Sequence, residues 1–129
     1  MRDAEEFGLS QIGQISDNVH DVQKATAFYR DTLGMKFLFE VPKMAFFDCG
    51  GVRLMLAVAE QPEFDHPASV IYYRVADIHA AHELLASRGV RFEGKPHFIA
   101  RLSDHDLWMA FLRDTDNNLL ALMSEVHRG

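Results

Sequence analysis

The pattern of apolar and polar residues repeats in the two halves of the chain. Apolar residues recur every three or four positions from Val22 to Leu33, and they do so again from Ile78 to Leu85. This spacing is typical of a helix that buries one face. Each half of the chain therefore predicts one amphipathic helix.

Both predicted helices have recognisable ends. Asp21 and Asp77 stand immediately before the apolar stripes, where a short carboxylate accepts hydrogen bonds from the free amides of a first helical turn. Gly34 and Gly89 follow the stripes, and glycine suits the left-handed position just past a helix end. The two helices are thus delimited by the same signals.

Strands are predicted on both sides of each helix, because the flanking runs are rich in apolar, β-branched and aromatic residues. Tight turns beginning at Asp48 and Asp114 join the last two strands of each half. The expected strands are 11–19, 36–41, 45–49 and 52–58 in the first half, and 69–75, 91–102, 107–113 and 119–126 in the second.

These elements predict an α+β fold made of two βαβββ modules. Module one covers about residues 11–58, module two covers about residues 69–126, and a linker with two prolines, residues 59–68, joins them. Since neither sheet buries a face alone, we expect the modules to pair into one cupped mixed sheet, within one chain or between two. The whole chain, 1–129, is then a single domain.

Composition and net charge exclude some classes of binding partner. The chain has 129 residues, 48% of them hydrophobic and 25% charged, as in a soluble globular domain. The net charge of -6, with no run of Lys or Arg, argues against nucleic acid. Cys49 is the one cysteine, and no segment resembles a signal peptide or a membrane span. We therefore expect a cytoplasmic protein with no membrane partner, and the apolar edge strands lead us to expect a homodimer.

Two segments of the sequence resemble those of the vicinal oxygen chelate (VOC) superfamily, which includes glyoxalase I, the bleomycin and fosfomycin resistance proteins and the extradiol dioxygenases. Residues 15–35 read ISDNVHDVQKATAFYRDTLGM, and they resemble the family's strand, Asp-capped helix and FYxxxLG ending. Residues 111–122 read FLRDTDNNLLAL and resemble its DPDGN turn and final strand, with Thr115 for Pro and Asn117 for Gly. The resemblance extends over the chain after Leu9 and implies the glyoxalase/bleomycin-resistance/dioxygenase fold.

The resemblance also implies where a divalent metal would bind. Metal-dependent members hold the ion with one side chain from the first and one from the last strand of each module. The matching positions here are Gln14, Met55, Val70 and Ala121. Only Gln14 offers a donor suited to a hard divalent ion, so we expect no metal cofactor at this position.

The same sheet face suits an organic ligand. Strand alternation places several side chains on it, and we add Trp108 from the aromatic stretch 107–111, although alternation leaves open which of its sets faces the cavity. This mostly apolar surface with two arginines favours a small molecule bearing an anionic group. The alternative is that both arginines reach water and pair with surface acids. The candidate ligand-binding residues are Gln14, Arg53, Met55, Val70, Tyr72, Arg74, Trp108, Ala121 and Met123.

The histidines supply an alternative metal set. His97 and His105 flank a predicted hairpin turn, so cross-strand pairing would bring their rings together. Together with Gln14 they form a second, displaced set of ligands, and His105 also has Asp104 and Asp106 beside it. The competing interpretation is an ordinary solvated turn.

Three hypotheses for function follow. The first is a glyoxalase- or bleomycin-resistance-like protein that binds a small molecule in an apolar cavity without chemistry. The second is a divalent-metal-dependent lyase, isomerase or dioxygenase that uses an altered ligand set. The third is a non-catalytic structural or regulatory module. No nucleophile motif is present, since Cys49 lies in a turn without an adjacent base.

Overall fold

The computed structural model of the protein describes residues 7–67 and 69–128. Residues 1–6, Ala68 and Gly129 lie outside the described residues. The predicted domain 1–129 includes all of them, and the predicted linker 59–68 includes Ala68. The elements of the first half are β1 (Gln14–Asn18), α1 (Val22–Ala27), η1 (Phe28–Thr32), β2 (Lys36–Val41), β3 (Met44–Cys49) and β4 (Val52–Ala57). After a short turn, η2 (Pro62–Phe64), the second half contains β5 (Ile71–Arg74), α2 (Ile78–Ser87), β6 (Arg91–Phe92), β7 (His97–Arg101), β8 (His105–Arg113) and β9 (Leu119–His127).

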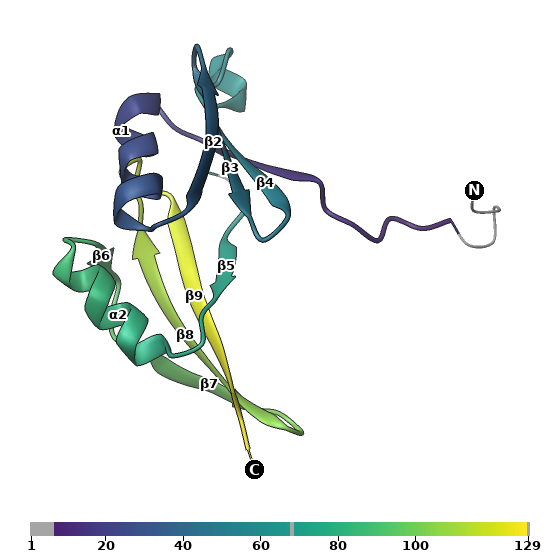
Figure 1. The fold of residues 1–129 in the computed structure, drawn as a ribbon, viewed down its shortest axis with the longest axis vertical. Helices are drawn as coiled ribbons and strands as arrows, with labels where there is room; N and C mark the ends of the chain where they lie inside the picture. Colours follow the sequence, from purple (N-terminus) through teal and green to yellow (C-terminus); the bar gives the residue numbers. More distant parts are fainter. Residues whose placement is uncertain (1–6, 68, 129) are drawn as a thin grey trace.

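The strands form two mixed sheets with the same plan, which confirms the predicted α+β fold. The first sheet has the order β1-β4-β3-β2, and the second has the order β5-β9-β8-β6, with β7 also paired to β8. In each sheet the strand before the helix runs parallel to the last strand, and the remaining pairs are antiparallel. Figure 1 shows the two modules one above the other along the long axis of the molecule.

The predicted helix boundaries are confirmed. The Asp21 carboxylate accepts a hydrogen bond from the amide of Lys24, and the Asp77 carboxylate accepts from those of His79 and Ala80. Gly34 and Gly89 have φ angles of 76° and 87°, which residues with a Cβ rarely adopt. The same capping chemistry therefore delimits both helices.

The first helix differs from a regular α-helix in its second half. After Ala27 the backbone continues as a π-helix, in which the amide of Leu33 donates to the carbonyl of Phe28, five residues earlier. This wider turn contains Tyr29, whose side chain is fully buried. The second helix is regular over ten residues.

The strand predicted over 91–102 is divided into β6 and β7. The interruption contains Gly94 and Pro96, and proline has no amide to donate to a neighbouring strand. The remaining predicted strands are present, although β5 begins at Ile71 and leaves Val70 just outside it.

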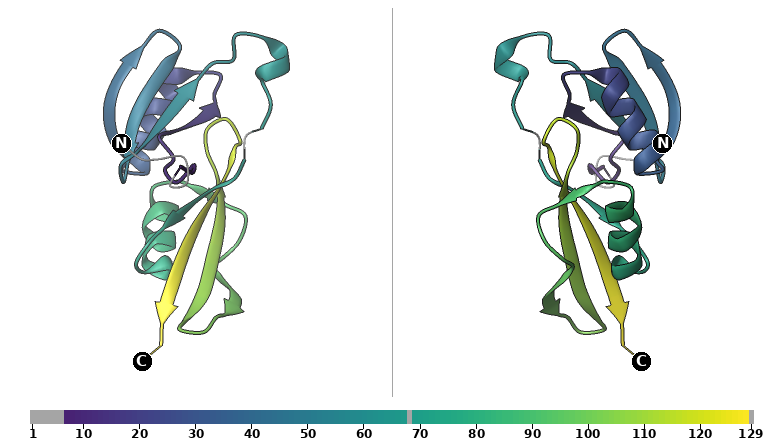
Figure 2. Two further views of the ribbon diagram at one scale, coloured as in Figure 1. Left: turned by 90° about the vertical axis from the view of Figure 1, so that its right-hand side faces the viewer. Right: turned by 90° about the vertical axis from the view of Figure 1, so that its left-hand side faces the viewer.

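Both helices lie on the same side of the molecule, where they cover one face of each sheet (Figures 1 and 2). The core between helices and sheets is continuous across the modules, and its largest fully buried apolar side chains are Val19, Tyr29, Phe47, Leu56, Leu112 and Leu120. The opposite face of each sheet has no helix over it and is called the helix-free face below. Among the described residues, no helix is both long enough and apolar enough to cross a membrane.

Candidate functional site

The helix-free face carries most of the residues that the sequence proposes as ligand-binding. Strand register settles this placement, since directly paired residues point to the same side of a sheet. Gln14 pairs with Arg53 in the first sheet, and Tyr72 pairs with Ala121 in the second. Other side chains of this face are Phe39, Phe46 and Met55 in the first sheet and Arg74, His97, Met109, Phe111 and Met123 in the second.

In the first sheet, Arg53 is held by neighbours on its own face. Its Nε donates to the Gln14 side-chain oxygen over 2.8 Å, and its guanidinium carbon lies 5.6 Å from the centre of the Phe46 ring. The Gln14 amide nitrogen lies 3.8 Å from the sulfur of Met55. Arg53 is therefore oriented by an amide and an aromatic face rather than by a surface carboxylate.

In the second sheet, the same face is more aromatic. The Tyr72 ring meets Phe111 edge to face with a centroid distance of 6.2 Å, and His97 stacks on the same Phe111 ring at 6.2 Å. Arg74 lies at the end of β5, with its Nε 3.9 Å from a Glu125 oxygen. Because the Arg74 side chain is 71% exposed, this ion pair is weak and leaves the guanidinium accessible to a ligand.

Trp108 does not belong to this face. It pairs with Ser124, and its indole contacts the imidazole of His79 on α2 at a centroid distance of 5.2 Å. The assignment of Trp108 to the ligand-facing set is thus corrected, because the register of β8 places Met109 and Phe111 on the helix-free face instead.

Two cavities open beside β5, at the seam between the sheets. One of about 580 Å³ is lined by apolar side chains of both modules, including Ile15, Leu54 and Ile71, and by Tyr72 and Arg74. The other, of about 410 Å³, shares Ile15, Ile71 and Tyr72. The seam therefore offers an apolar wall with a phenol and a guanidinium at its edge.

The predicted ligand-binding residues are divided between the seam and the sheet surface. Val70, Tyr72 and Arg74 line the seam cavities. Gln14, Arg53, Met55, Ala121 and Met123 do not line them. The apolar lining from Ile15 and Ile71 is not predictable from alternation, which assigns these side chains to the helix-covered core and gives no signal that the edge strands β1 and β5 leave them partly exposed.

The metal position that the resemblance to the VOC superfamily implies is not suited to a divalent ion. The Gln14 oxygen already accepts from Arg53, and its amide nitrogen faces a thioether. Val70 and Ala121 have no donor atoms. A hard divalent ion requires several oxygen or imidazole ligands, so these residues do not fit it.

The alternative metal set is also not assembled as predicted. His97 pairs with Met109 rather than with His105. The turn between β7 and β8 lies directly before His105, so His105 is at the turn end of this hairpin and His97 is at its open end. The His97 ring nitrogen faces the carbonyl of Lys95 at 3.2 Å, and Gln14 contacts Arg53. The expected proximity of the His97 and His105 rings is therefore wrong.

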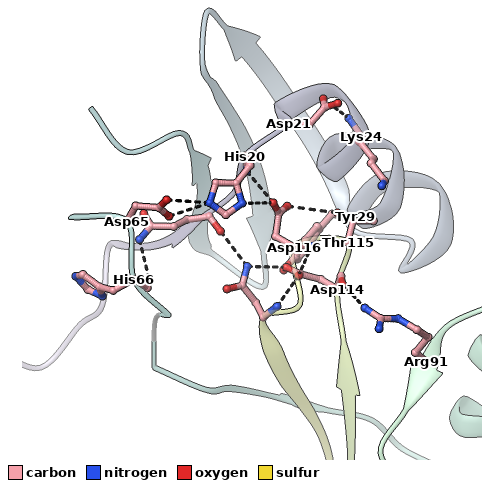
Figure 3. Close-up of polar contacts among 12 residues, drawn as sticks. His20, Asp21, Lys24, Tyr29, Asp65, His66, Arg91, Asp114, Thr115 and Asp116 are labelled. Atoms are coloured by element: carbon pink, nitrogen blue, oxygen red, sulfur yellow. Dashed lines mark hydrogen bonds and ion pairs between the residues drawn. The ribbon is translucent and has the colours of Figure 1, made fainter. Parts of the chain in front are cut away.

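A hydrogen-bond network joins the modules beside the first helix (Figure 3). The Tyr29 hydroxyl donates to the Asp114 carboxylate over 2.8 Å, and both groups are buried. The other Asp114 oxygen accepts from the amides of Asp116 and Asn118. The Asn118 side chain donates to Asp114 and to the carbonyl of Asn18, so that the turn of module two is anchored to module one.

The linker is tied to the same point. The His20 ring contacts Asp116 through Nδ1 and Asp65 through Nε2, each at 2.9 Å (Figure 3). Hydrogen bonding to Asp65 is the largest cause that raises the pKa of His20, and Asp116 adds to it. The Asn18 amide donates to the carbonyls of Phe64 and His66. The linker is thereby held against the start of the first helix.

The buried carboxyl of Asp17 and the buried hydroxyl of the half-buried Tyr73 lie at the seam. Asp17 is 3% exposed, and burial together with the negative charge of Asp114 raises the pKa of its carboxyl to about 6. The Tyr73 hydroxyl is buried without a hydrogen-bond partner among the described residues, and burial raises its pKa. Asp17 lies on an edge strand, yet its side chain is buried.

Cys49 also lines the larger cavity. Burial, together with the negative charge of Asp48, raises the pKa of its thiol. Since the thiolate is the nucleophilic form, this environment disfavours covalent chemistry at Cys49 at neutral pH.

Comparison with known proteins gives a consistent result. A family model described as "Glyoxalase/Bleomycin resistance protein/Dioxygenase superfamily" matches residues 11–122. The Uncharacterized protein YraH of Bacillus subtilis is 28% identical, over 84% of this chain and 94% of that protein. The Metallothiol transferase FosB of Staphylococcus saprophyticus is 29% identical, over 87% of this chain but only 60% of its own length.

Solved structures share the arrangement of the two modules. The crystal structure of a member of the glyoxalase/bleomycin resistance protein/dioxygenase superfamily from Sphaerobacter thermophilus has a TM-score of 0.73 and 23% sequence identity. The match covers 91% of this chain and 98% of that one. At this level of identity the likeness shows the fold alone.

Proposed function

We propose that this chain, which belongs to the Glyoxalase/Bleomycin resistance protein/Dioxygenase superfamily, binds a small organic anion in the seam cavities beside β5. The ligand's apolar body lies against Ile15, Leu54 and Ile71, and its anionic group lies beside Arg74 and Tyr72. The observation that carries the proposal is this combination of an apolar wall with one accessible guanidinium.

Binding without metal-assisted chemistry at the usual VOC position is the form of this function that the residues support. Only Gln14 among the matching positions carries a donor, and it is engaged by Arg53. A metal-dependent reaction is the second candidate, and the relative FosB is named a metallothiol transferase. It requires a metal bound elsewhere in this chain.

We further propose that the protein works as a homodimer in the cytoplasm. The edge strand β2 carries three large apolar side chains, Leu38, Phe39 and Val41, each more than 40% exposed. Contact with a second copy would cover them. The single cysteine, which allows no intrachain disulfide, is consistent with a reducing compartment.

The ligand proposal is tested with a charged and a neutral probe of the same shape. Phenylacetate and phenylacetamide are titrated into the protein and followed by ligand-observed NMR. We expect phenylacetate to bind more tightly, and we expect Arg74→Gln to weaken its binding about ten-fold while phenylacetamide is unaffected, because a charge-assisted hydrogen bond is lost.

Arg30→Gln is the matched control. Arg30 pairs with Asp31 on the first helix, away from the seam, so its loss leaves phenylacetate binding unchanged. Equal affinities of the wild type and Arg74→Gln for phenylacetate, or no binding of either probe, would rule out the proposed site.

A further inference from the structure

One cluster of potential metal ligands lies far from the usual VOC position, at the end of the second sheet where β8 begins and β9 finishes (Figure 1). His105 and His127 are direct cross-strand partners there. Directly paired residues project to the same side of a sheet with their Cβ atoms about 5 Å apart, so the two imidazoles share one face. Asp104, in the turn before β8, completes the cluster.

The distances within the cluster suit a shared ion. One ligand atom from each of the three residues lies within 4.8 Å of the other two. His105 Nδ1 is 2.7 Å from one Asp104 oxygen, and His127 Nδ1 is 3.8 Å from the other. Two imidazole nitrogens and one carboxylate form a common ligand set for first-row divalent transition metals, with open positions left for solvent or substrate.

The far side of the His105 ring supports the same assignment. Its Nε2 is buried and has no hydrogen-bond partner within residues 7–67 and 69–128, and a carboxylate oxygen of Glu125 lies 3.6 Å away. A metal-ligating histidine usually directs its second ring nitrogen at a carboxylate, which fixes the tautomer and the ring orientation. Glu125 is placed to do this while Nδ1 faces the Asp104 carboxylate and His127.

The turn that carries Asp104 is firmly anchored. The guanidinium of Arg128 donates to the carbonyls of Leu102 and Ser103 and to the carboxylate of Asp106, and its backbone amide donates to the Asp104 carbonyl. This cation is thus engaged by groups other than the Asp104 carboxylate. The turn is held against the end of β9, so the three ligands are positioned before any ion binds.

We propose that Asp104, His105 and His127 bind one divalent transition-metal ion, with zinc as the reference ion, and that Glu125 orients His105 from behind. The site differs from the sequence-based alternative, since it shares only His105 with the set Gln14, His97 and His105. Glu125 also pairs with Arg74, which connects the ion to the face that we propose binds organic anions. The inference does not depend on that ligand.

Zinc binding to the whole protein tests the proposal. After chelator treatment, isothermal titration with zinc should show one ion per chain, and cobalt should bind at the same site with a visible absorption band. His127→Asn should weaken zinc binding at least ten-fold without affecting folding, because the side chain is 66% exposed. Glu125→Gln should weaken it about ten-fold, as expected for a residue behind a ligand.

His97→Asn is the control, because it removes a histidine of the same sheet face that lies outside the cluster. Its zinc affinity should equal that of the wild type. The proposal is overturned if zinc fails to bind, or if it binds with unchanged affinity to His127→Asn. A loss of zinc affinity in His97→Asn with none in His127→Asn would instead assign the ion to the set Gln14, His97 and His105. Phenylacetate binding, measured separately, distinguishes failure of this site from failure of the seam.

Discussion

The two modules follow one plan, yet neighbouring polar groups at the junction between them differ in their hydrogen bonding. Counting from the capping residues Asp21 and Asp77, Tyr29 in module one corresponds to Leu85 in module two. Tyr29 donates a hydrogen bond to Asp114 across the junction, whereas a leucine has no hydroxyl with which to make the reciprocal contact. The repeat therefore specifies the architecture, and single substitutions within it decide how the modules are joined.

Asp17 and Tyr73 also occupy corresponding positions in the repeat, and their polar groups are in an unfavourable environment. Both side chains lie on the helix-covered side of their strands at the seam, and burial raises the pKa of each. The Tyr73 hydroxyl has no partner among the described residues. Both carboxylate oxygens of Asp114 accept hydrogen bonds, whereas the Tyr73 hydroxyl makes none within the described part of the chain, and unsatisfied buried groups are uncommon in proteins. Tyr73 lines one of the seam cavities and Asp17 lines the other.

The largest loss of stability is expected at Asp114, whose carboxylate oxygens both accept hydrogen bonds. Asp114→Ala leaves the Tyr29 hydroxyl and the amides of Asp116 and Asn118 without their acceptor. Because each unsatisfied buried group costs about 1–3 kcal/mol, we expect the free energy of unfolding to fall by about 4 kcal/mol. Urea denaturation followed by circular dichroism measures this change.

Asp48, which begins the corresponding turn of module one, provides the control. Its carboxylate accepts one hydrogen bond, from the amide of Gly51, so Asp48→Ala should cost about 1 kcal/mol. Comparable losses in the two variants would mean that Asp114 acts only as a turn residue and does not join the modules.

Removal of the Asp17 charge is expected to raise the free energy of unfolding, and the size of this change depends on pH. The pKa of the Asp17 carboxyl is raised from 3.8 to about 6 by folding, so the folded state binds a proton more tightly than the unfolded state. Stability from this group is present below pH 4 and is lost as the pH rises to about 6. Above that pH the ionised group destabilises the fold by ~3 kcal/mol.

Asp17→Asn should therefore raise the free energy of unfolding by up to ~3 kcal/mol at pH 7.5 and by little at pH 4. Urea denaturation of both proteins at several pH values between ~4 and ~8 measures the difference. A stabilisation that did not change with pH would show that ionisation of Asp17 is not its cause.

Much of the fold could be predicted from the sequence, because local chemistry determines it. Asp21, Gly34, Asp77 and Gly89 delimit the helices by interactions within a few residues of each. The π-helical turn around Tyr29 was not predictable in this way, because the apolar spacing from Val22 to Leu33 is that of a regular helix.

The candidate site was less predictable, because it depends on register and on how two sheets meet. Trp108 was misplaced since alternation identifies two sets of side chains but not the face that each takes. The pairing of His105 with His127, rather than with His97, depends on the position of a turn and on a strand more than twenty residues away. Single-strand patterns contain neither piece of information.

The smallest predicted change in stability also gives the most direct comparison of a paired and an unpaired hydroxyl. Tyr73→Phe removes a buried hydroxyl that has no partner, so it should leave stability unchanged or raise it by about 1 kcal/mol. Tyr29→Phe makes the same chemical change at a hydroxyl that is paired, and loss of its hydrogen bond to the buried Asp114 carboxylate should cost about 2 kcal/mol. Thermal and urea denaturation of the two variants compare identical deletions of one oxygen atom. If Tyr73→Phe were destabilised as much as Tyr29→Phe, the Tyr73 hydroxyl would have a partner in solution, and the proposed difference between the two hydroxyls would be wrong.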